Sequence, residues 1–199
     1  VQKLDPAERV SREEMLRAAN AYYDAIEQSD GTVAPFADEC QRREGGITSA
    51  NNQDPIPGDL APGSIAQFGR MRCGEQLSTG VMGYITDINQ RRLFAVDEEM
   101  GLVMAFSMFN HDGDPNPLPI RKVPGVTERA NEWGQFSVGA GHIYKIRSGK
   151  IHEIEAIACV GIPYQASDGW SCTRSCLVEK MDQYLAALAA NDPSAAPLS

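Results

Sequence analysis

Apolar residues recur at helical spacing near the start of the chain. Ser11 and Glu14 form the S-x-x-E pattern of a capping box, in which each residue satisfies a free backbone N–H of the first turn. Gly31 offers a C-cap at the other end. The pattern predicts a first helix from Ser11 to about Gly31. Its apolar positions are Met15, Ala19, Tyr22 and Ile26.

Most of the later apolar runs are typical of strands. A polar segment ending at Gly45 and Gly46 is predicted to be extended, and 73–80 to form a short helix. Segments 81–89 and 91–99 are predicted to be extended, and the stretch "GLVMAFSMFNHDG" at 101–113 then returns as the second strand of an antiparallel hairpin. The clearest hairpin is 136–160, whose two long strands meet at Ser148 and Gly149.

Proline and glycine mark two long irregular segments, 47–72, which has room for one short helix, and 112–135. An amphipathic helix is predicted at 171–190, followed by a flexible tail at 191–199. We therefore expect one domain over 1–190 with two long loops. A helix followed by antiparallel strands predicts an α+β fold, in which a curved sheet wraps around the N-terminal helix and forms a cone with a pocket.

Two stretches carry a family resemblance. The first-helix segment "LRAANAYYDAIEQSDG" and the hairpin "GHIYKIRSGKIHEIEAIA" resemble the nuclear transport factor 2-like (NTF2-like) superfamily, particularly its SnoaL-like enzymes. The resemblance implies the cone fold and chemistry without a cofactor. The middle of the chain, "FADECQRREGG" and "CGEQLSTGVMGYITDINQRRLFAVDEEMGLV", is similar to longer bacterial and fungal members. The characterised chemistry suggested there is a lyase that removes formaldehyde from a lignin-derived diarylpropanediol and leaves a stilbene.

Composition narrows the choice of partners. The 199 residues carry 18 Lys and Arg against 27 Asp and Glu, a formal charge of -9, so nucleic acid is not an expected partner. No apolar run approaches the roughly 18 residues of a membrane span, so no membrane partner is expected either. Nucleotide-binding and zincin motifs are missing, so we expect no cofactor. An odd count of five cysteines favours a reducing compartment, and we expect a cytoplasmic protein, although one or two disulfides stay open.

Metal binding is not expected, because the five cysteines include no C-x-x-C and the chain has only three histidines.

His111 ends the apolar strand, and its near-neutral intrinsic pKa suits proton transfer. The alternative is a histidine that hydrogen-bonds the turn after it. In "DECQRRE" an arginine facing the cone, for which we choose Arg43, would stabilise an oxyanion or grip a phenolate. The alternative is a solvated charge run.

Glu155 falls within a half-buried strand, where a carboxylate could act as acid or base, though a surface position is equally open. Tyr22 and Tyr23 lie on the first helix, and the family resemblance favours Tyr23 as the catalytic phenol. Packing in the core with a hydrogen-bonded hydroxyl is equally open. A pocket for a flat ring system would draw its lining from aromatic and thioether side chains. The candidates for binding substrate are Phe36, Tyr84, Met104, Met108, Phe109 and Trp133.

The leading hypothesis is a cofactor-free lyase that acts on a small aromatic substrate by general acid-base catalysis. A dehydratase, isomerase or epoxide hydrolase of the same fold is the enzymatic alternative, and a non-catalytic ligand-binding domain is the other. The strand at 102–109 has apolar residues on both faces, and one face must fill the cone. Because the opposite face would need a cover, we expect a homo-oligomer, either a dimer or a trimer.

Overall fold

The computed structural model describes residues 2–54, 62–131 and 134–162, with side chains described up to residue 158. The expected helix at 171–190, the tail and Trp133 lie outside the described residues. The helical elements are η1 (Pro6–Glu8), α1 (Arg12–Glu27), α2 (Ile65–Arg70) and α3 (Cys73–Ser78). The strands are β1 (Phe36–Glu44), β2 (Ile47–Ala50), β3 (Asp87–Asp97), β4 (Leu102–His111), β5 (Leu118–Val123), β6 (Val126–Arg129), β7 (Phe136–Arg147) and β8 (Lys150–Ile162).

Helix α1 begins where the capping pattern predicts. The hydroxyl of Ser11 accepts a hydrogen bond from the backbone N–H of Glu14, which satisfies one of the free donors of the first turn. The helix ends at Glu27, a few residues before Gly31. Its apolar side is fully buried, so the helix is held mainly by packing against the sheet. The buried residues are Met15, Ala18, Ala19, Tyr22, Tyr23, Ala25 and Ile26.

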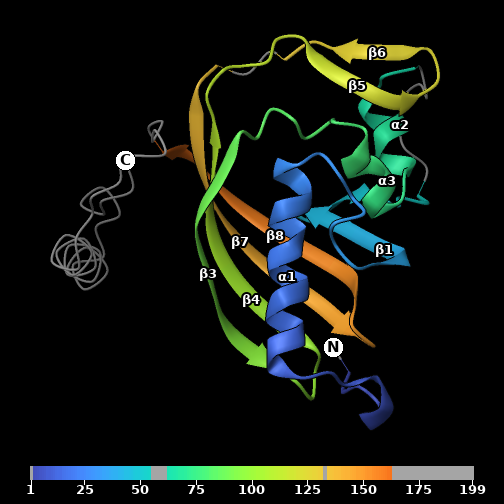
Figure 1. The fold of residues 1–199 in the computed structure, drawn as a ribbon, viewed down its shortest axis with the longest axis vertical. Coiled ribbons are helices and arrows are strands. Elements are labelled where there is room, and N and C mark those ends of the chain that lie inside the picture. The colour runs from blue at the N-terminus through green and yellow to red at the C-terminus, as the bar shows by residue number, and fades with distance from the viewer. Residues whose placement is uncertain (1, 55–61, 132–133, 163–199) are drawn as a thin grey trace, which may run out of the picture. The chain divides into compact units, whose positions relative to one another are not determined.

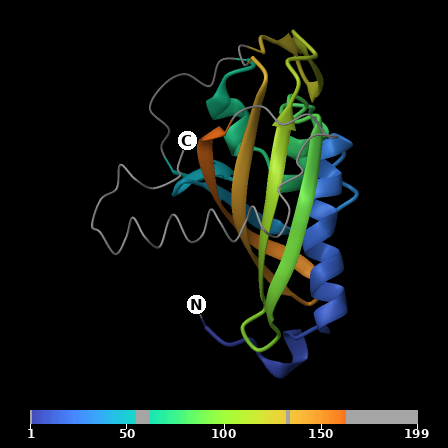
Figure 2. The same ribbon diagram turned by 90° about the vertical axis from the view of Figure 1, so that its left-hand side faces the viewer.

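Six strands form one sheet in the order β2-β1-β8-β7-β4-β3. Neighbouring strands are antiparallel except β1 and β8, which run parallel. The predicted turn between β7 and β8 is confirmed, since Ser148 and Gly149 both adopt the positive φ that a tight hairpin needs. The sheet curves past α1, which lies along its inner face (Figures 1 and 2). The expected α+β architecture, a curved sheet against the N-terminal helix, is confirmed.

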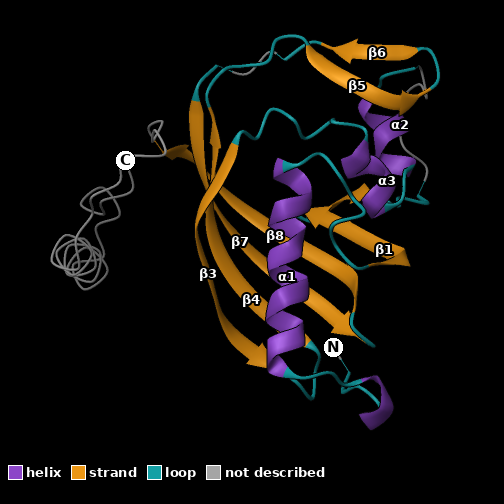
Figure 3. Ribbon diagram, in the orientation of Figure 1, coloured by secondary structure: helices purple, strands orange, loops and turns teal. Residues whose placement is uncertain are grey.

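The two segments expected to be irregular contain strands. β2 forms within 47–72, and β5 and β6 pair as a separate two-stranded sheet within 112–135 (Figure 3). These strands are too short to show the alternating pattern of a longer strand. Three prolines before and within β5 also predicted a loop there and not a strand. Conversely, residues 81–84 form turns, and the strand expected from residue 81 begins only at Asp87. The β5–β6 hairpin packs on α2 through a small apolar cluster, formed by Phe68, Val81, Ile120 and Val123.

Candidate functional site

A cavity of about 560 Å³ lies between α1, the turns after α3 and the inner face of β1, β4, β7 and β8. This volume is in the range of small-molecule sites. Most of the wall is apolar or aromatic, so a ligand with an apolar body would be desolvated there. The lining residues are Tyr22, Glu44, Gly45, Met82, Tyr84, Ile85, Phe109, Phe136, Ser137, Val138, Ala140, His142, Ala156 and Ala158.

Strand register places two ionisable residues of the wall in one row. Glu44 of β1 is paired with Ala156 of β8, and Ala156 is paired with His142 of β7. Residues in such a row point to the same face of the sheet, so both side chains flank the methyl group of Ala156. Two strand spacings separate their backbones by about 10 Å. A small residue between two polar ones leaves room for a ligand that touches both.

His142 is held by Tyr23 and by aromatic rings. Its Nδ1 lies 3.2 Å from the hydroxyl of Tyr23, and only 3% of the residue is exposed. The imidazole stacks on Phe109 and Tyr144 at ring distances of 5.4 and 5.9 Å. Burial, helped by the charge of Arg42, lowers the pKa of His142 to about 3. His142 is therefore neutral at neutral pH.

Arg42 is a buried cation next to the cavity, with 1% of its surface exposed. Its guanidinium lies 5.8 Å from the ring centre of Tyr22, close enough for a cation–π contact. Burial raises the pKa of Tyr22 to about 12, and Arg42 offsets part of that rise. Burial also raises the pKa of Tyr84. Both phenols that line the cavity thus stay protonated in the physiological range and can donate hydrogen bonds.

A chain of hydrogen bonds connects α3 to Glu44. The guanidinium of Arg42 donates to the side-chain oxygens of Gln76 and of Glu44. The amide of Gln76 donates to the backbone carbonyls of Ser49 and Phe68, at 2.6 and 2.8 Å. These two bonds fix which end of the Gln76 amide faces Arg42. The position of the Glu44 carboxylate is therefore tied to β2, α2 and α3 through Arg42.

Cys40 and Cys73 form a disulfide between β1 and α3, and both residues are fully buried. The sequence left disulfides open, because cysteine spacing alone does not fix a pairing. The compartment expected from the odd cysteine count stays a prediction.

His111, the first catalytic candidate from the sequence, lies behind the cavity wall. It is fully buried, and its Nε2 lies 3.3 Å from the side-chain amide of Asn131. The rings of Tyr84 and Phe136, at 5.9 and 5.0 Å, stand beside it, and these two residues line the cavity. His111 itself is not among the lining residues. Its catalytic role stays a prediction, and its placement favours His142 instead.

The choice of Arg43 as the arginine facing the cone does not fit the structure. Strand register places Arg43 in a cross-strand row with Glu155, Ile143 and Met104. In this row Ile143 and Met104 are exposed. Arg43 pairs with Glu153 on that outer face at 3.4 Å. Arg42 is the inward arginine, because the alternation of β1 buries Cys40 and Arg42 together. Arg43, Glu155 and Met104 therefore lie on the side of the sheet away from the cavity.

The other predicted residues divide between the wall and its surroundings. Tyr23 points inward but contacts His142, whereas its neighbour Tyr22 lines the cavity. Tyr84 and Phe109 line the cavity as expected. Phe36 packs edge-on against Tyr22 at 6.4 Å. Met108 is buried but is not a lining residue.

Sequence reasoning missed His142, Glu44 and Arg42. The alternation of side chains along β7 held a usable signal for His142. His142, Tyr144 and Ile146 are two residues apart and therefore share one face, and Tyr144 and Ile146 are buried. For β1 the signal was weaker. Its charged residues fall on both faces, and only the placement of Cys40 reveals which face is buried.

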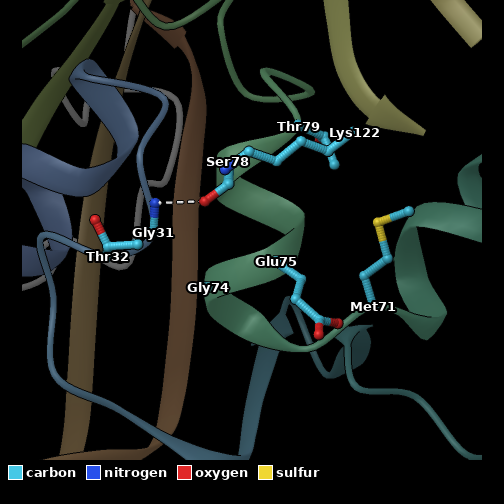
Figure 4. Close-up of a pocket in the computed structure, with 8 residues that line it drawn as sticks. All are labelled: Gly31, Thr32, Met71, Gly74, Glu75, Ser78, Thr79 and Lys122. Carbon is cyan, nitrogen blue, oxygen red and sulfur yellow. Dashed lines mark hydrogen bonds between the residues drawn. The ribbon is translucent and has the colours of Figure 1, made fainter.

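A second pocket of about 460 Å³ lies beside α3 (Figure 4). Two of its hydroxyls are engaged in local structure. The Ser78 hydroxyl accepts from the backbone N–H of Gly31 at 2.9 Å, and the Thr79 hydroxyl donates to the Gln76 carbonyl at 2.6 Å. Glu75 accepts from the backbone N–H of Arg72 at the start of α3. These three polar groups of the pocket therefore take part in local structure.

Among residues 2–54, 62–131 and 134–162, no group of three or more His, Cys, Asp or Glu is arranged to hold a metal ion. No helix in this part of the chain is long and apolar enough to cross a membrane.

Residues 8–158 match the model of a protein family described as a domain of unknown function, DUF8021. The match spans well over half of the chain. The chain belongs to the DUF8021 family. No curated protein matches it. Membership of DUF8021 thus places the cone and its cavity within one family without assigning an activity.

Solved structures give distant similarities to this DUF8021 chain. A protein from Jannaschia described as a SnoaL-like polyketide cyclase is 11% identical with a TM-score of 0.41, over 79% of this chain and 91% of its own. AusH from Aspergillus nidulans is 13% identical with a TM-score of 0.42, over 84% and 95%. An epoxide hydrolase-like protein of M. tuberculosis is 10% identical with a TM-score of 0.39, over 90% and 98%. Similarities this weak carry no argument about activity.

Proposed function

We propose that the protein is an enzyme that converts a small molecule with an apolar, ring-containing body by moving a proton. The observation that carries the proposal is the row formed by Glu44, Ala156 and His142. The row places a carboxylate and a neutral imidazole on either side of the Ala156 methyl group, in the wall of a cavity with an apolar lining. His142 is buried and Glu44 is partly open to solvent, and a few polar groups that converge on an apolar cavity are typical of small-molecule sites.

The two groups suit complementary tasks. A carboxylate can remove a proton from carbon, and a neutral imidazole can form a hydrogen bond with the oxygen on which charge develops. Reactions that begin with loss of a proton next to a carbonyl need both at once. Isomerisation and elimination by a lyase start in this way. The phenols of Tyr22 and Tyr84 add two further hydrogen-bond donors at the wall.

The apolar lining supports the aromatic substrate expected from the sequence. Tyr22, Tyr84, Phe109 and Phe136 provide ring faces or edges, and Ala140, Ala156 and Ala158 provide a low floor. The release of formaldehyde from a diarylpropanediol has no support from the similar proteins described above. We therefore limit the proposal to proton transfer on an apolar carbonyl compound or phenol.

Exchange of carbon-bound hydrogen for deuterium tests the proposal without knowledge of the natural substrate. The probes are 1-indanone and 2-tetralone in D2O, with loss of the signal next to the carbonyl followed by proton NMR. We expect the wild-type protein to accelerate exchange of at least one ketone. Glu44→Gln should lower that rate about a hundredfold, as loss of a general base does. Arg43→Gln, on the outer face, serves as the matched control and should retain it.

Failure of both ketones to exchange faster than in buffer would contradict the proposal. Equal rates for the wild type and Glu44→Gln would show that another group removes the proton. The non-catalytic alternative from the sequence predicts binding of the ketones without any exchange, so a binding measurement on the same samples separates the two.

A further inference from the structure

The hydroxyl of Tyr23 and Nδ1 of His142 form a hydrogen bond inside the core, at 3.2 Å. Tyr23 is fully buried, so neither group can exchange this partner for water. The proton lies on one of the two atoms. Which atom holds it decides whether the other ring nitrogen of His142 is a donor or an acceptor.

The surroundings of Tyr23 favour donation by the phenol. Among the described residues, the Tyr23 hydroxyl makes its hydrogen bond with Nδ1 of His142, whereas the hydroxyls of Ser107 and Tyr144 make none. A phenol that donates to Nδ1 places its proton on an acceptor. If Nδ1 instead carried the proton and donated to the phenol oxygen, the proton of the fully buried Tyr23 would lack an acceptor, which is costly.

The other ring nitrogen belongs to the cavity. His142 is a lining residue, and within the described residues its Nε2 has no protein hydrogen-bond partner. If Nδ1 accepts from Tyr23, a neutral imidazole must hold its single proton on Nε2. That N–H is then available to a ligand in the cavity.

We propose that Tyr23 is a positioning residue that fixes His142 as the Nε2–H tautomer, so that the substrate presents an oxygen acceptor, a carbonyl or an oxyanion, to His142. The inference rests on the proposed function, because it makes His142 the oxygen-binding partner of Glu44. The neutral imidazole donates to the oxygen, and Tyr23 never touches the substrate.

The low pKa of His142 is consistent with this role. An imidazole that stays neutral at neutral pH does not become a cation when the oxygen develops charge, but it stabilises that charge through its N–H. The charged side chain that acts on His142 is Arg42, whose positive charge opposes protonation as burial does. Both influences keep the ring neutral while Tyr23 selects the tautomer.

The tautomer can be read directly by 15N NMR of the histidine rings in the full chain, with His142 assigned by its loss in His142→Gln. We expect a pyrrole-type Nε2 and a pyridine-type Nδ1 in the wild type. Tyr23→Phe should mix the two tautomers. Tyr144→Phe removes the hydroxyl of the tyrosine that stacks on His142 and should keep the wild-type pattern. A protonated Nδ1 in the wild type would overturn the proposal whatever the activity.

A binding experiment tests the substrate chemistry separately. The probes are 1-indanone and indane, which share a ring system and differ in one carbonyl oxygen. We expect the wild type to bind 1-indanone about tenfold more tightly, the scale of one good hydrogen bond, and Tyr23→Phe to lose most of this preference. Equal affinities in the wild type would overturn the assignment of His142 as donor. Binding of neither compound would count against the proposed function, while the NMR pattern still decides the tautomer.

Discussion

Cys40 on β1 and Cys73 on α3 form a disulfide immediately beside the bond between Arg42 and Gln76. Arg42 follows Cys40 by two residues on the same face of the strand, and Gln76 follows Cys73 by three residues on the same helix. Because strand and helix repeat at these spacings, the covalent and the hydrogen-bonded links lie side by side. Together they join α3 to the strand that carries Glu44.

Loss of the disulfide should lower stability. The bond closes a loop across a sequence separation of 33 residues, and constraining a loop of that length contributes about 2–4 kcal/mol. We expect Cys40→Ala/Cys73→Ala to unfold at a lower urea concentration, by a corresponding free energy. A thiol reductant should shift the wild type in the same direction and leave the double variant unchanged. Identical midpoints for wild type and variant would contradict the prediction.

Arg42 and Arg43 are adjacent in sequence and face opposite sides of the sheet, so they form a matched pair. Arg42→Met removes a buried cation and leaves Gln76 and Glu44 without their partner, which should cost about 3 kcal/mol. Arg43→Met breaks a partly exposed pair with Glu153 and should cost less than about 1 kcal/mol. Urea unfolding of both variants checks the difference. Equal losses would mean that the inward position of Arg42 is wrong.

His142 should make the fold sensitive to acid. Its pKa is lowered from 6.5 to about 3 in the folded chain, so the unfolded chain takes up a proton there first as the pH falls. The stabilisation is present above pH 6.5 and is lost progressively down to about pH 3. Between neutral pH and about pH 4 the loss should be about 3 kcal/mol.

The measurement for His142 is the free energy of unfolding at both pH values in wild type and His142→Gln. The difference between the two proteins isolates this residue, because other carboxylates titrate in both. We expect a smaller loss on acidification in the variant. The same loss in both would show that His142 is exposed enough to be protonated in the folded state.

Ala156 should control access to the space between Glu44 and His142. Ala156→Leu places a branched side chain on the floor that separates them, so the cavity should bind 1-indanone at least about tenfold more weakly. Ile157→Leu changes the next residue, which is 65% exposed on the opposite face, and should bind as the wild type does. Calorimetry on both variants makes the comparison. Unchanged affinity in Ala156→Leu would place the ligand elsewhere.

Much of the fold follows from local pattern. The N-cap at Ser11, the helical spacing after it and the turn at Ser148 and Gly149 each depend on neighbours in sequence, and each was predicted correctly. The parallel pairing of β1 with β8 was not predicted. It joins segments more than 100 residues apart, and no local preference records that pairing.

The candidate site was predicted less well for the same reason. To choose between His111 and His142, or between Arg43 and Arg42, one must know which side chains of a strand face inward. Strand register and the position of α1 decide this. Glu44 and His142 lie close together only because β8 stands between their strands. The residue types, a histidine, an arginine and a carboxylate, could be proposed from the sequence. Which of them line one cavity depends on how the strands pair in the sheet.

The outer face of the sheet supports the expectation of a homo-oligomer. Five large apolar side chains between 38% and 65% exposed lie on neighbouring strands there: Phe94, Met104, Phe106, Ile143 and Ile157. Phe94 stacks on Phe106, which gives the patch a flat centre. A patch of this kind is usually covered by another chain, and we expect a second copy to cover it.

Phe106→Arg should therefore shift the protein toward the monomer mass of 21.6 kDa in light scattering. Ile47→Arg changes an isoleucine of β2 that is 72% exposed and serves as the control that keeps the oligomer. A wild type that is already monomeric at micromolar concentration would refute the expectation.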